Sequence, residues 1–584
     1  MKASPIIRHC SGSQRFLKRR KTVNSQAQSY LEEALAEFFS ARSALTGEAR
    51  EQLYDLLKRL VASLAEGHIC LPLSEQERQL LAPVSLVADC NDIKEVQTAA
   101  LVVYGGSLYF ERYFNYERRL ALRLVALADD GFDLAADEAA LQRLFARELG
   151  ENKEQEQAAR DILHKALVIV SGGPGTGKTT TIVKMLVSLL ASSKKDLKIG
   201  LAAPTGKAAA RLAESVGTSL GSLELPDWIV ARMPTEATTL HRLLGVRRYS
   251  SRFRHNRDNP VDFDVVVVDE ASMVDLAMMS KLVDALKPGS RLVLLGDKNQ
   301  LASVESGAVL ADCIEGLPTN TIELLHVYRF DDTIQTLAAA INQGDMQAVW
   351  GQLNDQENGN LSVVCEENLL AYCCDRYDEY LRLAEENSVP DETCIHRLFA
   401  AFRRFQVLCA LTSGGRGAIA INQRIEQGLA GKGRLCKPGD WYNGRPVLIT
   451  RNDYNLGLYN GDIGICLWSH QGKGFEVWFE GPGGELHSHK TGLLPEFETV
   501  YAMTIHKSQG SEFDEVFVVL PDEENRVLGR ELLYTAVTRA KTAVKIAGSR
   551  PVLALALERR HQRQTGLKAM LEQMQYTQTA SSDV

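Results

Sequence analysis

One stretch of the sequence, residues 167–181, constrains the fold more than any other. It opens with the apolar run LVIV, continues through the glycine-rich loop GGPGTGKT at residues 172–179, and leads into apolar residues at helical spacing from Ile182. Strand, glycine loop and helix in this order are the context of a phosphate-binding P-loop. The glycines let backbone N–H groups face a phosphate chain, and the helix N-terminus adds its positive dipole end. The sequence therefore predicts a nucleotide site on an α/β domain.

The loop residues have separate expected roles in that site. Lys178 can reach the β- and γ-phosphates, and the hydroxyl of Thr179 can ligate Mg²⁺. We therefore expect ATP and Mg²⁺ as cofactors. The residues expected to bind the nucleotide here are Gly172, Gly173, Pro174, Gly175, Thr176, Gly177, Lys178, Thr179 and Thr180.

Length and composition place the chain among globular proteins of several domains. Its 584 residues suggest about three to five domains, and 45% of them are hydrophobic. No run of about 18 apolar residues occurs, so we expect no membrane span and no membrane partner. The basic cluster Arg15 to Lys21 has no apolar segment behind it, which argues against a secretory signal. The eleven cysteines are scattered without a C-x-x-C motif, which predicts reduced thiols in a cytoplasmic protein.

Patterns along the chain divide it into five segments. Residues 1–150 are mainly helical, with a predicted hairpin of Leu101–Tyr104 and Ser107–Phe110 across two glycines. This first segment carries no recognisable chemistry, and it is either a docking module or a structural cap. The strands predicted next are Leu167–Val170, Lys198–Ala202, Val265–Val268 and Arg291–Leu295.

Alternation of these strands with helices predicts a parallel sheet covered on both faces across residues 151–330. Residues 331–430 are expected to be helical with one buried strand, Gln406–Leu411, and residues 431–495 to form a glycine-punctuated antiparallel β insertion. Residues 496–584 return to strand and helix and end in a polar helical tail. The whole chain is therefore predicted to be an α/β protein.

Two carboxylates end the buried strand VVVV at residues 265–268. Beside a P-loop, Asp269 can hold the Mg²⁺ shell, and Glu270 can position and deprotonate the attacking water. Capping of a following helix is the alternative role for this pair. After the next strand, Gln300 suits a γ-phosphate sensor, because an amide can both donate and accept a hydrogen bond.

Two arginines far from the P-loop in sequence are candidates for stabilising the transferred phosphoryl group. They are Arg329, in the sequence VYRF, and Arg539, in ELLYTAVTRA. Phosphoryl transfer spreads negative charge over the equatorial oxygens, which guanidinium groups stabilise. Each arginine alone could equally form a surface ion pair. Together they suggest that a second domain delivers them across a cleft.

A third set of residues is suited to a nucleic-acid strand. Hydroxyls, lysines and backbone amides at strand ends position phosphates and do not read bases. No dense aromatic platform accompanies them, so binding is expected to be largely independent of base sequence. A net charge of −8 means that the basic surface must be a local groove or be shared with a partner. The candidate DNA-binding residues are Thr205, Lys207, His241, Thr504 and His506.

The order of the motifs is similar to that of a known family. LAAPTGKAAARL, TTLHRLLG, VVVDEASMVDL, GDKNQLASVESGAVL, AMTIHKSQGSEFDEV and ELLYTAVTRAK follow the P-loop along the chain. In this order they resemble the superfamily 1 helicases of the branch that moves 5′ to 3′, and within it the RecD family, the α subunits of exodeoxyribonuclease V (RecBCD). The resemblance covers about residues 55–560, and the first 25 residues match nothing.

The resemblance implies a fold and an activity. It implies two RecA-like motor domains with ATP between them, the first at residues 151–330 and the second at 331–430 and 496–584. It also implies an SH3-like β domain at 431–495 and a partner-docking domain at 1–150. The implied activity is ATP-dependent 5′-to-3′ DNA unwinding, without a nuclease centre of its own. Such a subunit works in a heterotrimer with RecB-like and RecC-like subunits, on DNA ends in double-strand break repair and recombination.

The resemblance also assigns individual residues. Gln155 falls at the adenine-reading position, with neighbouring Gln157 as the alternative, and Glu512 falls at a position that contacts the ribose. The five candidate DNA-binding residues match DNA-contacting positions. Three other readings remain: a free-standing RecD-like helicase, the motor half of a conjugative relaxase, and a nucleotide-binding scaffold that does not turn over. No relaxase head precedes the motor, and no expected catalytic residue is missing, which disfavours the last two.

Overall fold

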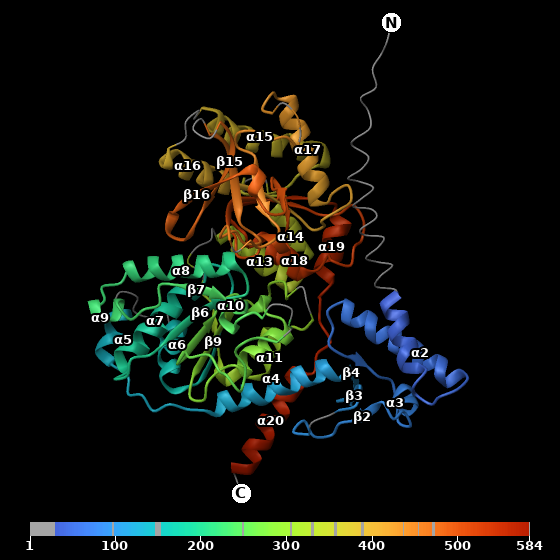
Figure 1. Cartoon of the computed structure of the whole chain (residues 1–584). Coiled ribbons are helices and arrows are strands. Elements are labelled where there is room, and N and C mark those ends of the chain that lie inside the picture. Colours follow the sequence, from blue (N-terminus) through green and yellow to red (C-terminus); the bar gives the residue numbers. More distant parts are fainter. Residues whose placement is uncertain are drawn as a thin grey trace.

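Two β-sheets, each built from parallel strands and lying one above the other, form the body of the molecule (Figure 1). The computed structural model describes residues 30–95, 98–145, 153–247, 250, 252–303, 306–326, 328, 332–355, 359–386, 391–435, 437, 439–453, 455–469 and 473–582. Within that part of the chain, no helix is both long and apolar enough to cross a bilayer.

The first sheet has six parallel strands in the order β10-β5-β9-β8-β6-β7. All four predicted strands are present, and the two additional edge strands, β7 and β10, have only three and four residues. Its strands are β5 (Leu167–Gly172), β6 (Ile199–Ala203), β7 (Ala237–Thr239), β8 (Val265–Val268), β9 (Arg291–Gly296) and β10 (Thr321–Leu324). Its helices are α6 (Lys153–His164), α7 (Lys178–Ser192), α8 (Gly206–Gly221), α9 (Asp227–Val230), α10 (Leu240–Leu244), α11 (Leu276–Asp284) and α12 (Val309–Gly316).

The second sheet has five parallel strands in the order β11-β20-β19-β12-β18. The strand predicted at Gln406–Leu411 is β12, which ends two residues earlier at Cys409. The strands are β11 (Leu361–Val363), β12 (Phe405–Cys409), β18 (Ala502–Thr504), β19 (Phe513–Val519) and β20 (Ala540–Ala547). The helices are α13 (Asp332–Gln343), α14 (Met346–Leu353), α15 (Glu366–Glu386), α16 (Glu392–Arg403), α17 (Ala418–Gly431), α18 (Arg530–Val537) and α19 (Arg550–Glu558). The fold is therefore α/β with two RecA-like motor domains.

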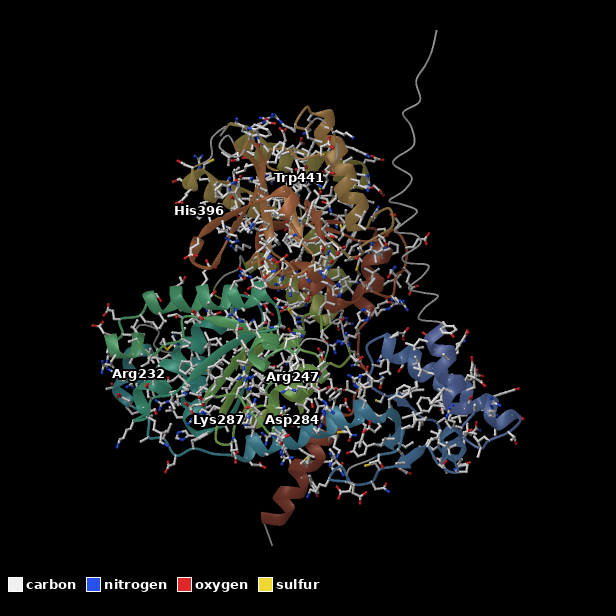
Figure 2. All side chains as sticks on the ribbon, viewed as in Figure 1. Arg232, Arg247, Asp284, Lys287, His396 and Trp441 are labelled. Atoms are coloured by element: carbon white, nitrogen blue, oxygen red, sulfur yellow. The ribbon has the colours of Figure 1, made fainter. Side chains whose placement is uncertain are left out.

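A five-stranded antiparallel sheet is inserted in the second motor domain, between α17 and β18. Trp441 packs near Phe497, with ring centroids 5.2 Å apart, and His396 of α16 lies 2.8 Å from Glu480; Trp441 and His396 are labelled in the upper part of Figure 2. The last strand lies beyond residue 495, where the insertion was predicted to end. The strands are β13 (Pro446–Ile449), β14 (Ile463–Ser469), β15 (Gly474–Glu480), β16 (Leu486–Lys490) and β17 (Phe497–Thr499).

The described part of the N-terminal segment is mainly helical, as predicted, and its hairpin belongs to a four-stranded sheet. The hairpin itself is confirmed, and Gly105 and Gly106 turn it with φ of 56° and 78°, which only glycine adopts at little cost. Residues 30–40 are also helical. The other elements are α2 (Glu48–Ala65), β1 (Leu71–Pro72), α3 (Glu75–Leu81), β2 (Val87–Asp89), β3 (Leu101–Tyr104), β4 (Ser107–Phe110), α4 (Glu111–Asp129) and α5 (Glu138–Phe145).

Helix α4 belongs to the core of the first motor domain. Its residues Leu120 and Leu124 are fully buried in the same apolar cluster as Val266 of β8 and Leu292 of β9. The elements before α4 enclose a separate core around Leu53, Leu56 and Leu57 of α2. Of the two readings of the N-terminal segment, α4 therefore has the structural role, and the elements before it are left as the candidate docking module.

The C-terminal tail was predicted to be polar, and this is wrong for α20 (Leu567–Ser582). Leu567, Met570 and Leu571 are buried, and the helix packs on α4 and α12 of the first motor domain. These residues recur at three- and four-residue steps, so they form one apolar stripe although the segment as a whole is polar. In Figure 1 the red C-terminal helix accordingly lies against blue α4, far from the second sheet.

Two buried carboxyl groups meet where α20 begins. Glu117 of α4 accepts hydrogen bonds from the N–H of Gly566 at 3.1 and 3.0 Å. Burial, together with the charge of nearby Asp312, raises the pKa of Glu117 well above its usual value. Burial likewise raises the pKa of Asp312 to about 7. Both carboxyls therefore bind a proton more tightly in the folded protein than in the unfolded chain.

This predicts how Asp312→Asn changes the dependence of stability on pH. A raised carboxyl pKa gives stability that is fully present below the unfolded pKa of 3.8 and is lost as pH rises through the folded pKa of about 7. The amide does not titrate, so the variant does not lose this stability as the pH rises. The melting temperature of the variant minus that of the parent should therefore increase by several degrees between about pH 5 and pH 8. Differential scanning fluorimetry at both values measures this. A variant whose melting temperature, relative to that of the parent, is lower at pH 8 than at pH 5 would contradict the raised pKa of Asp312.

Candidate functional site

The P-loop between β5 and α7 holds its lysine in place. Gly175 and Gly177 have φ of 79° and 80°, and a Cβ at Gly172 would lie 2.5 Å from the Thr176 hydroxyl. The Nζ of Lys178 donates to the carbonyls of Gly172 and Gly173, at 2.7 and 3.0 Å. The ammonium group therefore lies over the loop that a phosphate would enter. Pro174, Thr179 and Thr180 are partly exposed on the same loop and helix end.

Asp269 and Glu270 follow β8 at the same edge of the sheet. The N–H of Asp269 donates to Ala202 of β6 at 2.9 Å, and its carboxylate accepts from the N–H of Glu270 at 2.8 Å. Burial, and then the charge of Glu270, raises the pKa of Asp269 to about 6, while the charge of Lys178 opposes the rise. The P-loop lysine and the two carboxylates therefore act on one another electrostatically.

The backbone of Glu270 is strained. Its φ of 51° and ψ of 40° are left-handed, which is uncommon for a residue other than glycine, asparagine or aspartate. Such a conformation costs about 1–3 kcal/mol and persists only where the surrounding structure enforces it. Strain of this kind clusters at functional sites. A capping role gives no reason for it, since Glu270 makes no side-chain capping bond to the short helix that follows.

Gln300 lies in a turn built on Asp297, a residue that the sequence argument missed. Asp297 accepts hydrogen bonds from the N–H of Asn299 at 2.9 Å and from the amide of Gln300 at 3.2 Å. It also accepts one from the hydroxyl of Tyr534, at 2.9 Å, which comes from the second motor domain. Burial raises the pKa of Asp297. Asp297 directly follows β9, just as Asp269 directly follows β8. A search of the sequence for carboxylates after buried strands could therefore have found it.

Arg539 reaches the carboxylates of the first domain from the second. It follows α18, is 2% exposed, and donates to the carbonyls of Thr535 and Ser511 at 3.2 and 3.4 Å. Burial lowers its pKa, and the charge of Glu270 is the largest effect opposing that. The charge of Arg539 is therefore felt by a carboxylate of the first motor domain, and its delivery to the transferred phosphoryl group stays a prediction.

The second predicted arginine, Arg329, lies outside the described residues. Its described neighbour Tyr328 donates its backbone N–H to the carbonyl of Gly175 in the P-loop, at 2.9 Å. The role of Arg329 stays a prediction.

The structure separates the two glutamines that could read adenine. The side-chain amide nitrogen of Gln155 lies 2.8 Å from where a Cβ of Gly177 would be, and its oxygen accepts from Lys184 at 3.1 Å. The amide of Gln157 instead donates to Asp161 on its own helix. Only Gln155 faces the P-loop. Glu512, at the predicted ribose position, forms an ion pair with Arg211 of α8 at 2.9 Å, across the two domains.

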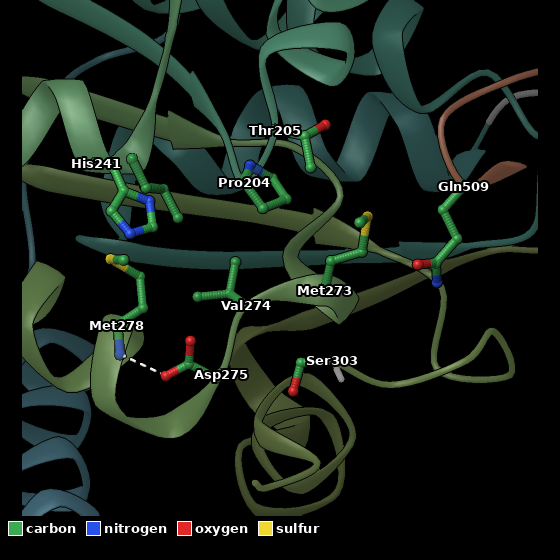
Figure 3. Close-up of a pocket in the computed structure, with 10 residues that line it drawn as sticks. Pro204, Thr205, His241, Met273, Val274, Asp275, Met278, Ser303 and Gln509 are labelled. Atoms are coloured by element: carbon green, nitrogen blue, oxygen red, sulfur yellow. Dashed lines mark hydrogen bonds between the residues drawn. The ribbon is translucent and has the colours of Figure 1, made fainter. Parts of the chain in front are cut away.

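The candidate DNA-binding residues lie at the carboxyl ends of parallel strands. Thr205 and His241 line one pocket of about 210 Å³ together with Gln509 of the second domain (Figure 3). Thr504 ends β18, and His506 lies two residues further along the chain. Burial lowers the pKa of His506. Two of the five, Thr205 and His241, thus share a pocket with a residue of the second motor domain, and Thr504 and His506 lie at a strand end of that domain.

Lys207 lies toward the inserted sheet. Burial lowers its pKa to about 8, and the charge of Asp462 in the insertion opposes this. A Cβ at neighbouring Gly206 would lie 3.1 Å from the side chain of Tyr459, also in the insertion. The insertion and the first motor domain therefore meet beside this lysine, which places it at the rim of the gap between domains.

Contacts between the domains were largely invisible in the sequence. Gln509 donates to the carbonyl of Leu301 at 3.1 Å, and the N–H of Leu301 donates to the hydroxyl of Thr535 at 3.0 Å. Arg211 donates to the carbonyl of Gly510 at 2.8 Å. These residues lie inside the quoted motifs, but no local pattern says which of them face the other domain.

A nucleotide on the P-loop would be contacted from both sheets, which is the arrangement of a two-domain P-loop motor. The family described as "AAA domain" matches residues 155–306, and the "UvrD-like helicase C-terminal domain" matches residues 499–547. Both are consistent with a helicase motor.

Relatives identify the family within this class. The RecBCD enzyme subunit RecD of Mycolicibacterium smegmatis is 41% identical, over 81% of this chain and 84% of the relative. The protein of the same name from Mycobacterium tuberculosis strain H37Rv is 40% identical, over 91% and 93%. The chain therefore belongs to the RecD family.

A more distant relative is itself named as a DNA helicase. The ATP-dependent RecD2 DNA helicase of Deinococcus radiodurans is 32% identical, over 80% of this chain but only 59% of the relative. A crystal structure of the Pif1 helicase from Bacteroides, in complex with ADP-AlF3 and single-stranded DNA, covers 69% of this chain with a TM-score of 0.39 and 17% identity.

Proposed function

We propose that this protein is an ATP-dependent 5′-to-3′ DNA helicase and the RecD-like subunit of a RecBCD-type complex that processes DNA ends in break repair and recombination. The observation that carries the proposal is Arg539 of the second motor domain, which is buried at 2% exposure and whose charge interacts with that of Glu270 in the first. A second domain that supplies a catalytic arginine makes hydrolysis depend on how the domains are placed, which is what a motor needs. No nuclease centre is proposed for this chain.

The phosphate chemistry falls to residues at one edge of the first sheet. Lys178 would neutralise the β- and γ-phosphates, and Glu270 would take the proton of the attacking water. Gln300 would contact the γ-phosphate, and Arg539, with Arg329, would stabilise the charge that spreads over its oxygens. The remaining loop residues, with Gln155 at the adenine and Glu512 at the ribose, would hold the nucleotide.

Mg²⁺ fits this donor set. The hydroxyl of Thr179 and the carboxylate of Asp269 are the oxygen donors that this ion prefers, and phosphates and water complete its shell. When bound, the ion neutralises the developing charge on the phosphates. Within the described residues no group of three or more His, Cys, Asp or Glu side chains could hold a metal by itself, so the site depends on the nucleotide.

A DNA strand would follow the strand ends where Thr205, Lys207, His241, Thr504 and His506 lie. Lys207, with a pKa of about 8, carries its positive charge in most molecules at neutral pH. Contacts to phosphates would make the affinity fall with salt and vary little with base sequence.

The polarity is tested with two substrates. A duplex with only a 5′ single-stranded tail should be unwound in the presence of ATP, and a duplex with only a 3′ tail should not. Strand displacement is followed by fluorescence, and Lys178→Ala is the control that should abolish it. Equal unwinding from both tails would refute the 5′-to-3′ assignment.

The assembly proposal rests on the N-terminal elements before α4. Of the domains predicted at 1–150, 151–330, 331–430, 431–495 and 496–584, we propose that the first docks through its elements before α4, and that the fourth, which extends to β17, is SH3-like. Near the start of the described chain Tyr30, Leu31 and Phe38 are 74%, 54% and 48% exposed, which offers an apolar face to RecB- and RecC-like partners. The cytoplasm is the proposed location, which fits the nine described cysteines, since none of them forms a disulfide.

The assembly is tested without truncation, because removal of α4 would expose the core of the first motor domain. Leu31→Asp with Phe38→Asp should prevent co-elution with co-expressed RecB- and RecC-like chains in size-exclusion chromatography. Val230→Asp, at a site 44% exposed on the first motor domain, is the matched control and should co-elute. Co-elution of the double variant would leave the N-terminal face without a docking role. A parent chain that never co-elutes would favour a free-standing RecD-like helicase.

A further inference from the structure

Two neighbouring residues of α18 reach across the domain boundary to the turn that follows β9. The hydroxyl of Tyr534 donates to Asp297 at 2.9 Å, and the hydroxyl of Thr535 accepts from the N–H of Leu301 at 3.0 Å. All the polar groups involved are withdrawn from water: Tyr534 is 5% exposed, Thr535 0% and Asp297 2%. We call these four residues the interdomain clamp. The turn that they hold contains Gln300.

The clamp is continuous with Arg539. The Nε of Arg539 donates to the carbonyl of Thr535 at 3.2 Å, so the residue that holds Leu301 through its hydroxyl holds the arginine through its backbone. Thr538 ties the end of the helix by donating to the carbonyls of Tyr534 and Thr535, at 2.8 and 3.2 Å. Residues 534–539 are therefore tied together, so that a shift of the clamp would carry the guanidinium group of Arg539 with it.

The clamp also touches the P-loop. A Cβ at Gly173 would lie 2.9 Å from the hydroxyl of Tyr534 and 3.9 Å from a carboxylate oxygen of Asp297. The absence of a side chain at Gly173 lets the tyrosine approach the loop, and the carbonyl of the same glycine accepts from Lys178. One hydrogen-bonded unit thus joins the Gln300 turn to Arg539, and it packs directly against the P-loop at Gly173.

We propose that Tyr534 and Thr535 are positioning residues, which set Arg539 and Gln300 in register with the nucleotide when the two motor domains meet. The proposal rests on the proposed function. Groups that act on the transition state must be placed closely, because a misplacement of about 1 Å can cost about 10²-fold in rate. The clamp supplies that placement through Asp297 and Leu301, without touching the reacting atoms.

Tyr534→Phe removes one hydroxyl and keeps the ring. It should lower kcat for DNA-stimulated ATP hydrolysis about tenfold and leave KM for ATP within about twofold, because the lost register matters in the transition state. Thr535→Val leaves the N–H of Leu301 buried without its acceptor and should do the same. In protein without nucleotide, hydrogen–deuterium exchange at residues 297–301 should be about five- to tenfold faster in both variants, as expected for the loss of one hydrogen bond.

Tyr380→Phe is the matched control, because Tyr380 is a buried tyrosine of the second motor domain whose hydroxyl donates to the carbonyl of Gly444, in the insertion, at 2.9 Å. It should lower the melting temperature but leave kcat and exchange at 297–301 at parental values. The proposal is overturned if Tyr534→Phe matches Tyr380→Phe in both readouts. A parent protein without ATPase activity would refute the proposed function, while the exchange measurement would still decide whether the clamp orders the turn.

Discussion

Glu270→Gln is expected to lower kcat for DNA-stimulated ATP hydrolysis by about 10²–10⁴-fold, the usual contribution of a general base. The amide cannot take a proton from water, but it keeps the size and polarity of the side chain. The left-handed backbone at φ 51° should be retained, since the surrounding structure enforces it. ATP should still bind, because Lys178 and the loop N–H groups are unchanged. Steady-state hydrolysis and binding of a fluorescent ATP analogue separate the two effects.

The control for this variant is Glu315→Gln. Glu315 forms an ion pair with Lys568 at 2.8 Å on the surface, where its side chain is 58% exposed and contributes little to stability. The Glu315→Gln variant should hydrolyse ATP at the parental rate. If Glu270→Gln also hydrolyses ATP at the parental rate, Glu270 is not the general base and has only a structural role.

Arg539→Ala is expected to lower kcat by about 10³–10⁵-fold, the range found for arginines that stabilise phosphoryl transfer from another domain. Arg539→Lys should restore only a small part of the rate, because a lysine keeps the charge but not the planar fork. The alanine variant could misfold, since Arg539 is buried and donates hydrogen bonds to the carbonyls of Thr535 and Ser511. The lysine variant is a milder change that controls for this. Single-turnover hydrolysis with DNA in excess measures the chemical step directly.

Arg530→Lys is the matched control on the same helix. Arg530 begins α18 and donates to the carbonyl of Leu557, in the neighbouring helix α19, and to the carbonyl of Asn342 in α13. It should keep the parental rate within about threefold, as expected away from reacting groups. If Arg539→Ala behaves like this control, the arginine stabilises the domain interface and has no part in the chemistry.

The sequence alone determined the features that depend on local backbone chemistry. The P-loop needs glycine at its left-handed positions, so GGPGTGKT could be recognised without any tertiary contact. The hairpin across Gly105 and Gly106 was predicted to the residue for the same reason. Asp269 was found because a run of four valines can only be a buried strand in this context, and a carboxylate at its end must face the P-loop edge.

Tertiary structure decided everything that depends on which surfaces meet. Gln155 and Gln157 are two residues apart on one helix, and only the packing of α6 on the P-loop distinguishes them. The C-terminal helix was predicted as a polar tail because its apolar stripe is short, and its partner, α4, lies more than 400 residues earlier in the chain. The clamp pairs Tyr534 with Asp297, 237 residues away. Neither residue has a local signal that names its partner, because hydrogen bonds between domains are set by the approach of two rigid sheets and not by the sequence around each group.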